Sequence, residues 1–247
     1  DLHSFPTRRS SDLWQRFDPT LVLLVPAIII AAIASSRVNS VFNRYSRIPN
    51  VRGLTGEQAA RIMLDANGLR DVAIEPVRGS LTDNYDPRTK TLRLSESVCN
   101  VQSVGAVSVA CHEAGHALQH AYGYKPLEIR SAIVPVVNIA SKASWILIII
   151  GIMLMSRATD SIGTTVFDIG VMAFIAVVAF HLITLPVELN ASSRAVAQMQ
   201  SLQIVNGEQE ITGSRKVLNA AAMTYIAALM ISVANLIRIL VIRGRRN

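Results

Sequence analysis

Residues 111–120 read CHEAGHALQH and contain an H-E-x-x-H pattern. On a helix, His112 and His116 lie about one turn apart on the same face, because residues i and i+4 are neighbours there. Two imidazoles in this arrangement can bind one Zn²⁺, and Glu113 lies beside the metal, where it can take a proton from a water molecule. The spacing therefore predicts a zinc-hydrolase helix, which still requires a third ligand and a cleft.

The segment around this pattern, residues 101–123, predicts a buried helix. It is rich in Ala and Val, contains no Pro, and ends at Tyr122-Gly123, where Gly123 suits a C-cap. The apolar run before the histidines indicates burial on most sides, which would give the ligands a rigid base. Ala114 and Gly115 are small, so we expect nothing bulky to crowd the metal or a substrate backbone.

The composition predicts a membrane protein. Of 247 residues, 51% are hydrophobic and 17% charged, and the mean hydropathy is +0.37. The net charge of +7 fits anionic lipid headgroups. Nucleic acid is rejected as a partner because the basic residues are scattered with few aromatics among them. Cys99 and Cys111 do not resemble a disulfide framework, and Cys111 is expected to be a small buried residue.

The first thirteen residues are interpreted as a non-native leader. They include FPTRRSSDL, which back-translates into a common sequencing-library adaptor. They are excluded from the fold prediction, as a fusion scar would be.

The expected fold class is an α-helical integral membrane protein with about four transmembrane helices and a small α+β zincin-like catalytic insert. Four apolar segments are long enough to cross a bilayer, and a polar stretch separates the first two. The predicted organisation is a leader at 1–13, a first transmembrane segment at 14–36, the catalytic insert at 37–132, second and third transmembrane segments at 133–185, a loop or helix with the third ligand at 186–216, and a fourth segment with a basic tail at 217–247.

Within the insert, residues 54–68 predict a capped amphipathic helix, since Thr55 and Gln58 have capping-box spacing. Residues 72–77 predict a short strand, and a second strand is expected at 90–94 after a tight turn.

Charge asymmetry predicts the sidedness of the insert. Residues 37–130 carry many Lys and Arg near the membrane, whereas the loop 156–163 has a single Arg. The positive-inside rule therefore places the insert and active site on the cytoplasmic face of the cell membrane. This topology puts the C-terminal RGRR outside, against the rule, so either the last segment stops short of crossing or the longer basic insert dominates.

The third ligand must lie on the same side, after the third segment. Glu188 is the only acidic residue there before Glu208, and a carboxylate beside two His leaves a fourth position for water. The rival ligand is His181, which lies about two turns earlier at membrane depth. An ordinary acid near a helix N-terminus is the alternative reading of Glu188.

Other polar residues are candidates for supporting roles around the site. His120 continues the register of the two ligands but lies about 12 Å along the axis from His112, so we expect it to support the site or bind substrate. The oxyanion partner is left open among His120, Tyr122, Tyr124 and Arg194. The polar residues inside the apolar segments either pair between helices or act near the site, and they are Lys142, Asp168, Asn235 and Arg238.

Several longer stretches together resemble the YugP family of bacterial membrane zinc metallopeptidases. They are YDPRTKTLRLSE, HEAGHALQHAYGYKPL, RSAIVPVVNIAS, LPVELNASSRA and RKVLNAAAMTYIAAL, and the resemblance covers about residues 14–238. It implies an integral-membrane, zinc-dependent endopeptidase with one Zn²⁺ per chain, in which His112 and His116 are ligands and Glu113 is the catalytic base.

A looser similarity connects the chain to HtpX-type and prenyl-protein-processing membrane proteases, whose third ligand opens a Glu-x-x-Ala-Asp pattern. Glu188 and Ala191 match that pattern, but Ser192 stands where the Asp would be. Ser192 or Asn190 would then have to support the ligands in its place.

The function expected is hydrolysis of a protein or peptide substrate close to the lipid bilayer, by a zinc-activated water with Glu113 as general base. The substrate could lie as an added strand along residues 90–94. A membrane scaffold or assembly factor with a structural zinc site is the second hypothesis. A transporter-like bundle with an accidental H-E-x-x-H pattern is the third, and a folded α+β insert disfavours it.

Overall fold

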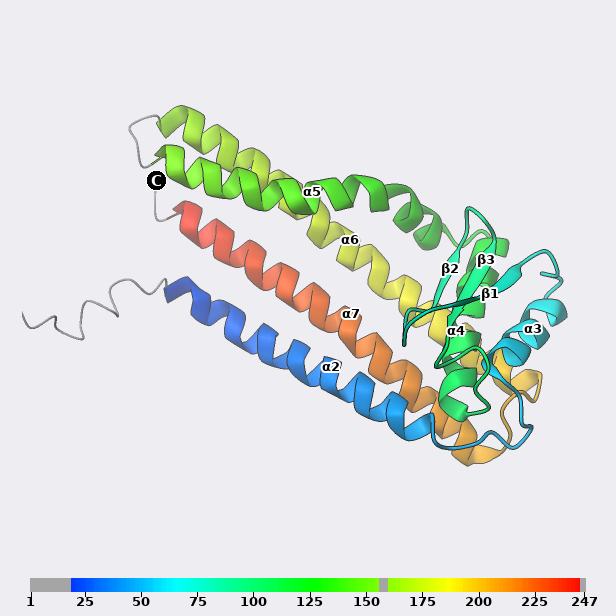
Figure 1. The fold of residues 1–247 in the computed structure, drawn as a ribbon. Helices are drawn as coiled ribbons and strands as arrows, with labels where there is room; N and C mark the ends of the chain where they lie inside the picture. Colours follow the sequence, from blue (N-terminus) through cyan, green and yellow to red (C-terminus); the bar gives the residue numbers. More distant parts are fainter. Residues whose placement is uncertain (1–18, 156–159, 245–247) are drawn as a thin grey trace, which may run out of the picture.

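Four long helices run side by side and carry a small α+β insert at one end (Figure 1). The computed structural model describes residues 19–155 and 160–244. The long helices are α2 (Val25–Tyr45), which follows the short 3₁₀ helix η1 (Pro19–Leu24), α5 (Lys125–Met155), α6 (Asp160–Ser201) and α7 (Gly207–Gly244). All four are long and apolar enough to cross a membrane, which confirms the predicted fold class.

The long helices pack in a row. α5 packs along α6, α6 along α7, and α7 along α2. The start of α2 and the end of α7 lie at the end of the bundle that is remote from the insert (Figure 1). At that end Arg243 of α7 pairs with Asp168 of α6 at 2.7 Å. Asp168 therefore joins two helices far from the H-E-x-x-H segment.

The insert begins with the amphipathic helix α3 (Gly56–Ala66). Thr55 caps it, and Thr55 and Gln58 form the predicted capping box, with bonds of 3.2 and 3.0 Å in the two directions. Three strands follow: β1 (Ala73–Val77), β2 (Asn84–Asp86) and β3 (Thr91–Ser95). Their order is β1-β3-β2, with β1 parallel and β2 antiparallel to β3. The strand expected at 90–94 is thus the central strand.

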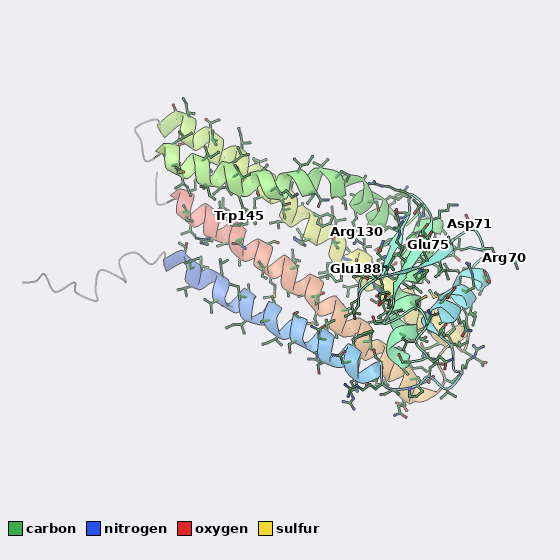
Figure 2. The ribbon with its side chains drawn as sticks, in the orientation of Figure 1. Arg70, Asp71, Glu75, Arg130, Trp145 and Glu188 are labelled. Atoms are coloured by element: carbon green, nitrogen blue, oxygen red, sulfur yellow. The ribbon has the colours of Figure 1, made fainter. Side chains whose placement is uncertain are left out.

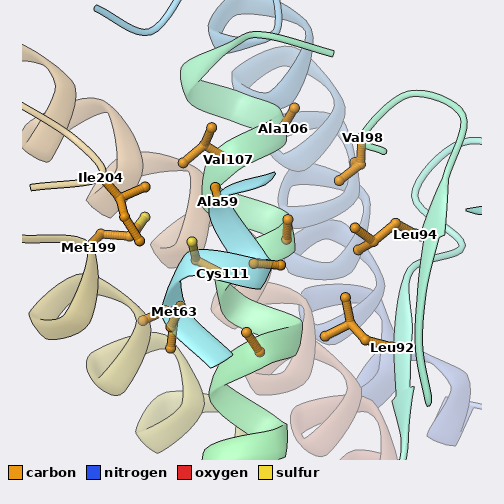
Figure 3. Packing of buried hydrophobic residues seen from close by; sticks show 14 of the residues in the cluster. Ala59, Met63, Leu92, Leu94, Val98, Ala106, Val107, Cys111, Met199 and Ile204 are labelled. Carbon is orange, nitrogen blue, oxygen red and sulfur yellow. The ribbon is translucent and has the colours of Figure 1, made fainter. Parts of the chain in front are cut away.

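The core of the insert surrounds α4 (Val104–Ala121), the helix that carries the H-E-x-x-H pattern. Figure 3 shows side chains of α3, β3 and α6 packed around it, among them Met63, Leu92, Leu94 and Met199, all fully buried. Cys111 is also fully buried in this cluster, as predicted. α4 is therefore held from several sides, which fixes the direction of its polar residues.

Two local features differ from expectation. α6 continues through Pro186, where the third apolar segment was expected to end, so one unbroken helix joins the membrane to the third-ligand region. Proline is tolerated inside membrane helices because neighbouring groups satisfy the freed backbone. Gly115 faces α6 rather than a substrate path: a Cβ there would lie 2.7 Å from the carbonyl oxygen of Ala191. Its small size permits the close crossing of α4 and α6.

Candidate metal centre

Three predicted ligands meet where α4 crosses α6. Oε2 of Glu188 lies 3.2 Å from Nε2 of His112 and 3.5 Å from Nε2 of His116. The ligand atoms of these residues all lie within 4.8 Å of one another, and Glu188 is only 2% exposed. The two histidines come from successive turns of α4, while the carboxylate comes from the membrane helix α6. Figure 2 shows Glu188 at the junction of bundle and insert.

The opposite edge of each imidazole is held by a second side chain. Nδ1 of His112 lies 3.2 Å from the hydroxyl of Ser192, and Nδ1 of His116 lies 2.9 Å from Oε1 of Gln119. Because Nδ1 is engaged in both rings, Nε2 is left to face Glu188 and a metal ion. Such contacts orient metal-binding histidines and fix which ring nitrogen carries the proton.

Gln119 connects the histidine helix to α6. Its amide nitrogen donates to the carbonyl oxygen of Val187 at 2.8 Å and to Oδ1 of Asn190 at 2.9 Å. Asn190 in turn accepts a bond from Nε of Arg194 at 2.8 Å. Ser192 therefore contacts His112 directly, Asn190 reaches His116 only through Gln119, and Arg194 contacts Asn190.

The second carboxylate oxygen of Glu188 is occupied by other groups. Nη1 of Arg130, at the start of α5, lies 2.9 Å from Oε1. The hydroxyl of Tyr225 on α7 also hydrogen-bonds the Glu188 carboxylate. With Oε1 held by Arg130, Oε2 remains directed at the two histidines. A buried carboxylate needs such pairing to stay ionised.

Glu113 lies beside the ligands in a small cavity. Burial raises the pKa of its carboxyl to about 7, with His112 opposing and Glu188 adding to the rise, and the backbone N–H of Tyr85 donates to it. A carboxyl that titrates near neutrality suits a general base. The geometry thus places a proton acceptor next to the three ligand atoms.

The cavity has a volume of about 220 Å³, and its walls come from both halves of the molecule. β2 and the turn around it contribute Tyr85 and Asp83, α5 contributes Arg130, and α7 contributes Tyr225. The sheet edge beside Glu113 is therefore β2. The expectation that a substrate pairs with residues 90–94 is wrong, because β3 already has a strand on each side.

The oxyanion candidates from the sequence lie elsewhere. His120 binds the hydroxyl of Tyr85 through Nδ1 at 2.9 Å and lines a separate cavity that opens toward Asp71 and Lys90. The guanidinium carbon of Arg194 lies 5.6 and 6.0 Å from the ring centroids of Tyr122 and Tyr124. None of these four lines the cavity that holds Glu113, whereas Arg130 and Tyr225 do.

His181, the rival third ligand, is not part of the ligand cluster. Glu188 follows it by seven residues on α6, and in the described part of the chain the cluster contains Glu188 instead. Arg238 donates to the hydroxyl of Thr20 at 3.1 Å, which joins α7 to η1. Asn235 donates to the carbonyl of Ile231 within α7. Both polar residues thus make bonds away from the metal centre.

Sequence reasoning missed Gln119, Arg130 and Tyr225. Gln119 stands three residues after His116, a spacing that puts the two on one helix face, so it could have been found. Arg130 stands near the end of the predicted insert and Tyr225 in the fourth apolar segment, and no local pattern connects either of them to the motif. Only the packing of α5 and α7 against α6 brings them to Glu188.

These residues fit a zinc ion. Two imidazole nitrogens and one carboxylate oxygen converge, the other ring nitrogens and the other oxygen are held by protein groups, and the cavity beside them can admit water. Three protein ligands with an open fourth position are the usual arrangement of catalytic zinc.

The chain belongs to the family described as "Putative neutral zinc metallopeptidase", whose model matches residues 20–244. It is 44% identical over 222 residues to a protein of Bacillus subtilis (strain 168) named "Putative membrane protease YugP", covering 90% of this chain and 95% of that protein. No solved structure matches the chain. The family and the four apolar helices make this a membrane protein of a zinc metallopeptidase family, in agreement with the resemblance seen in the sequence.

Proposed function

We propose that the protein is a membrane-embedded zinc endopeptidase with His112, His116 and Glu188 as ligands and Glu113 as general base. One observation carries the proposal: the buried carboxyl of Glu113 lies in the same cavity as His116 and Glu188, two of the three residues whose ligand atoms converge. A structural zinc site has no need of a buried carboxyl beside its ligands, whereas a zinc hydrolase needs one to accept a proton from water.

The roles of the protein groups follow from their positions. A bound zinc ion would polarise the scissile carbonyl and acidify a water molecule. Glu113 would remove the proton from that water and deliver it to the leaving amine. Arg130 lines the same cavity and has N–H groups besides the one that binds Glu188, and these can donate to negative charge that develops on the carbonyl oxygen. Tyr225 holds the Glu188 carboxylate in place.

The substrate is expected to bind in an extended form along β2. Among the described strands, β2 pairs only with β3. At the other edge of β2, the backbone N–H of Tyr85 donates a hydrogen bond to Glu113. A peptide added to a sheet edge gains main-chain hydrogen bonds without requiring a particular sequence. This mode suits an endopeptidase that accepts unstructured segments.

We further propose that the site faces the cytoplasm, because basic residues are concentrated on the insert side. At the remote end, Arg243 is paired with Asp168, so this C-terminal arginine is partly neutralised. α7 runs to Gly244 and is long enough to cross. Arg243 at the end of the described chain is therefore compatible with a position outside.

The test compares wild type with Glu113→Gln in detergent, measuring zinc per chain and cleavage of unstructured protein substrates. We expect one zinc in both and at least a 100-fold loss of cleavage in the variant, in line with the size of general-base effects. Glu57→Gln changes an acid of the insert outside the cavity and is the matched control. One zinc per chain in both with no cleavage by either would instead support the scaffold hypothesis, and equal cleavage by both would overturn the role of Glu113 as general base.

A further inference from the structure

The α5 wall of the metal cavity continues along the helix toward the membrane. Ser131 and Val134 line the cavity. Asn138, Lys142 and Trp145 follow Val134 by 4, 8 and 11 residues, so helical geometry places them on nearly the same face. These three residues are called the α5 stripe below.

The α5 stripe is polar and accessible where the helix is otherwise apolar. Asn138 and Lys142 are exposed, and Trp145 is 38% exposed. Along the helix axis, Lys142 lies about 20 Å from Met155, the residue at which α5 ends. A hydrocarbon layer is about 30 Å thick, so Lys142 lies well inside it. Within the described chain, no hydrogen bond or ion pair reaches the side chain of Lys142. An ionisable group at that depth usually has a functional partner.

α6 lies beside the α5 stripe and carries Glu188 further along. Phe174, His181 and Glu188 are spaced by seven residues and therefore share one side of the helix. The ring of Trp145 meets that of Phe174 edge-on, with centroids 5.6 Å apart. Phe174, Thr184 and Glu188 are buried, so the accessible route toward the cavity is the α5 stripe itself.

We propose that the α5 stripe binds the transmembrane segment of a membrane-protein substrate, with an acidic residue of that segment paired to Lys142. The proposal rests on the proposed peptidase function, and it names the substrate class. The stripe follows the cavity-lining residues on the same face of α5. A substrate segment that lies on the stripe therefore has the residues that follow it close to Glu113. An acidic partner removes the cost of leaving Lys142 unpaired in hydrocarbon.

The geometry predicts where such a substrate is cut. Lys142 and Arg130 are twelve residues apart on α5, or about 18 Å along the helix. An extended chain covers that distance in about six residues and a helix in about twelve. The scissile bond therefore lies about six to twelve residues from the acidic residue, on the side of the segment that enters the insert.

The experiment uses the full chain with zinc in liposomes and two substrates that share one cleavage sequence. One is a soluble peptide, and the other continues into a transmembrane helix with a Glu nine residues from the cleavage site. The measured quantity is the ratio of kcat/KM for tethered and soluble substrate. We expect Lys142→Leu to lower this ratio about tenfold. Val136→Leu, an exposed position on the other side of α5, should leave it unchanged.

Three outcomes decide the proposal. The proposal is overturned if Lys142→Leu leaves the ratio of kcat/KM unchanged. It is also overturned if Lys142→Leu lowers the ratio just as much for a tethered substrate that carries Gln in place of the Glu. If wild type cleaves neither substrate, the peptidase function fails instead, and a photo-crosslinker at position 138 or 136 of the Glu113→Gln variant, with Lys142 kept, still tests binding. Crosslinks to the substrate helix from position 138 alone support the proposal. Crosslinks between two copies of the chain show a dimer contact and overturn it.

Discussion

The insert and the membrane bundle bury their apolar side chains to very different extents. In the insert, Leu92, Leu94 and Met63 are completely inaccessible. In the bundle, Val136 and Ile139 are 64% and 72% exposed. The difference reflects the surroundings: the insert must hide its apolar groups from water, whereas lipid solvates them equally well on the outside of the bundle. The insert is therefore stabilised by its own core, and the bundle relies on close helix contacts.

The metal centre lies at the boundary of these two regions. The histidines come from α4, which belongs to the core of the insert, while Glu188, Arg130 and Tyr225 come from membrane helices. At the crossing, Gly115 lets α4 approach α6 closely. The geometry of the site thus depends on how well the boundary is held.

The largest effect is expected from a cavity in the insert. Leu94→Ala should lower the free energy of unfolding of the insert by about 2–5 kcal/mol, because the lost methyl groups leave a void in a fully packed core. Urea-dependent trypsin cleavage of the insert in detergent measures this. Ile139→Ala, on the lipid-facing surface of α5, should change it by less than about 0.5 kcal/mol. Equal effects of the two variants would refute the comparison.

A smaller effect is expected at the boundary. Gln119→Leu removes the bond to His116 and both bonds to α6, so zinc affinity should fall about 10- to 100-fold, or about 1.4–2.7 kcal/mol. Competition with a chelator of known affinity measures the change. Gln198→Leu, which removes a glutamine bonded to Asn67, is the control and should keep the wild-type affinity. An unaltered affinity in Gln119→Leu would show that the bonds from Gln119 to His116 and α6 do not orient the zinc ligands.

The smallest effect concerns the capping box of the insert. Thr55→Ala removes the side-chain cap of α3 and should cost about 1 kcal/mol of insert stability. Thr55→Ser keeps a hydroxyl acceptor and should restore most of it. The same trypsin assay applies, and the zinc content should not change. A loss of zinc in Thr55→Ala would mean that the insert and the metal centre are more tightly coupled than their packing indicates.

Local patterns were sufficient to predict one part of the molecule. The histidine spacing, the capping box at Thr55 and the position of Glu188 after the third apolar segment depend on a few neighbouring residues, and the structure places all of them as expected. The apolar segments also had enough length and hydropathy to indicate four crossings. Helical periodicity and bilayer thickness are local constraints that a sequence displays directly.

The remaining features depend on contacts between distant residues. Strand order decides that β2 rather than β3 borders the site, and a sequence does not display strand order. Arg130 and Tyr225 reach Glu188 only through helix packing. Pro186 indicated a helix end, yet the surrounding helices accommodate it. Local propensity was overridden here by tertiary contacts.

The unbroken α6 has a mechanical consequence. Its 42 residues form a rod about 63 Å long, with its first part in the bilayer and the proposed metal ligand Glu188 in its second part. A bilayer that is thinner or thicker than the apolar part of the bundle changes the tilt of membrane helices. When a rigid helix tilts, its end outside the bilayer moves further than the point about which the helix turns. Membrane thickness can therefore alter the distance between Glu188 and the two histidines, which would make the lipid environment an input to the metal centre.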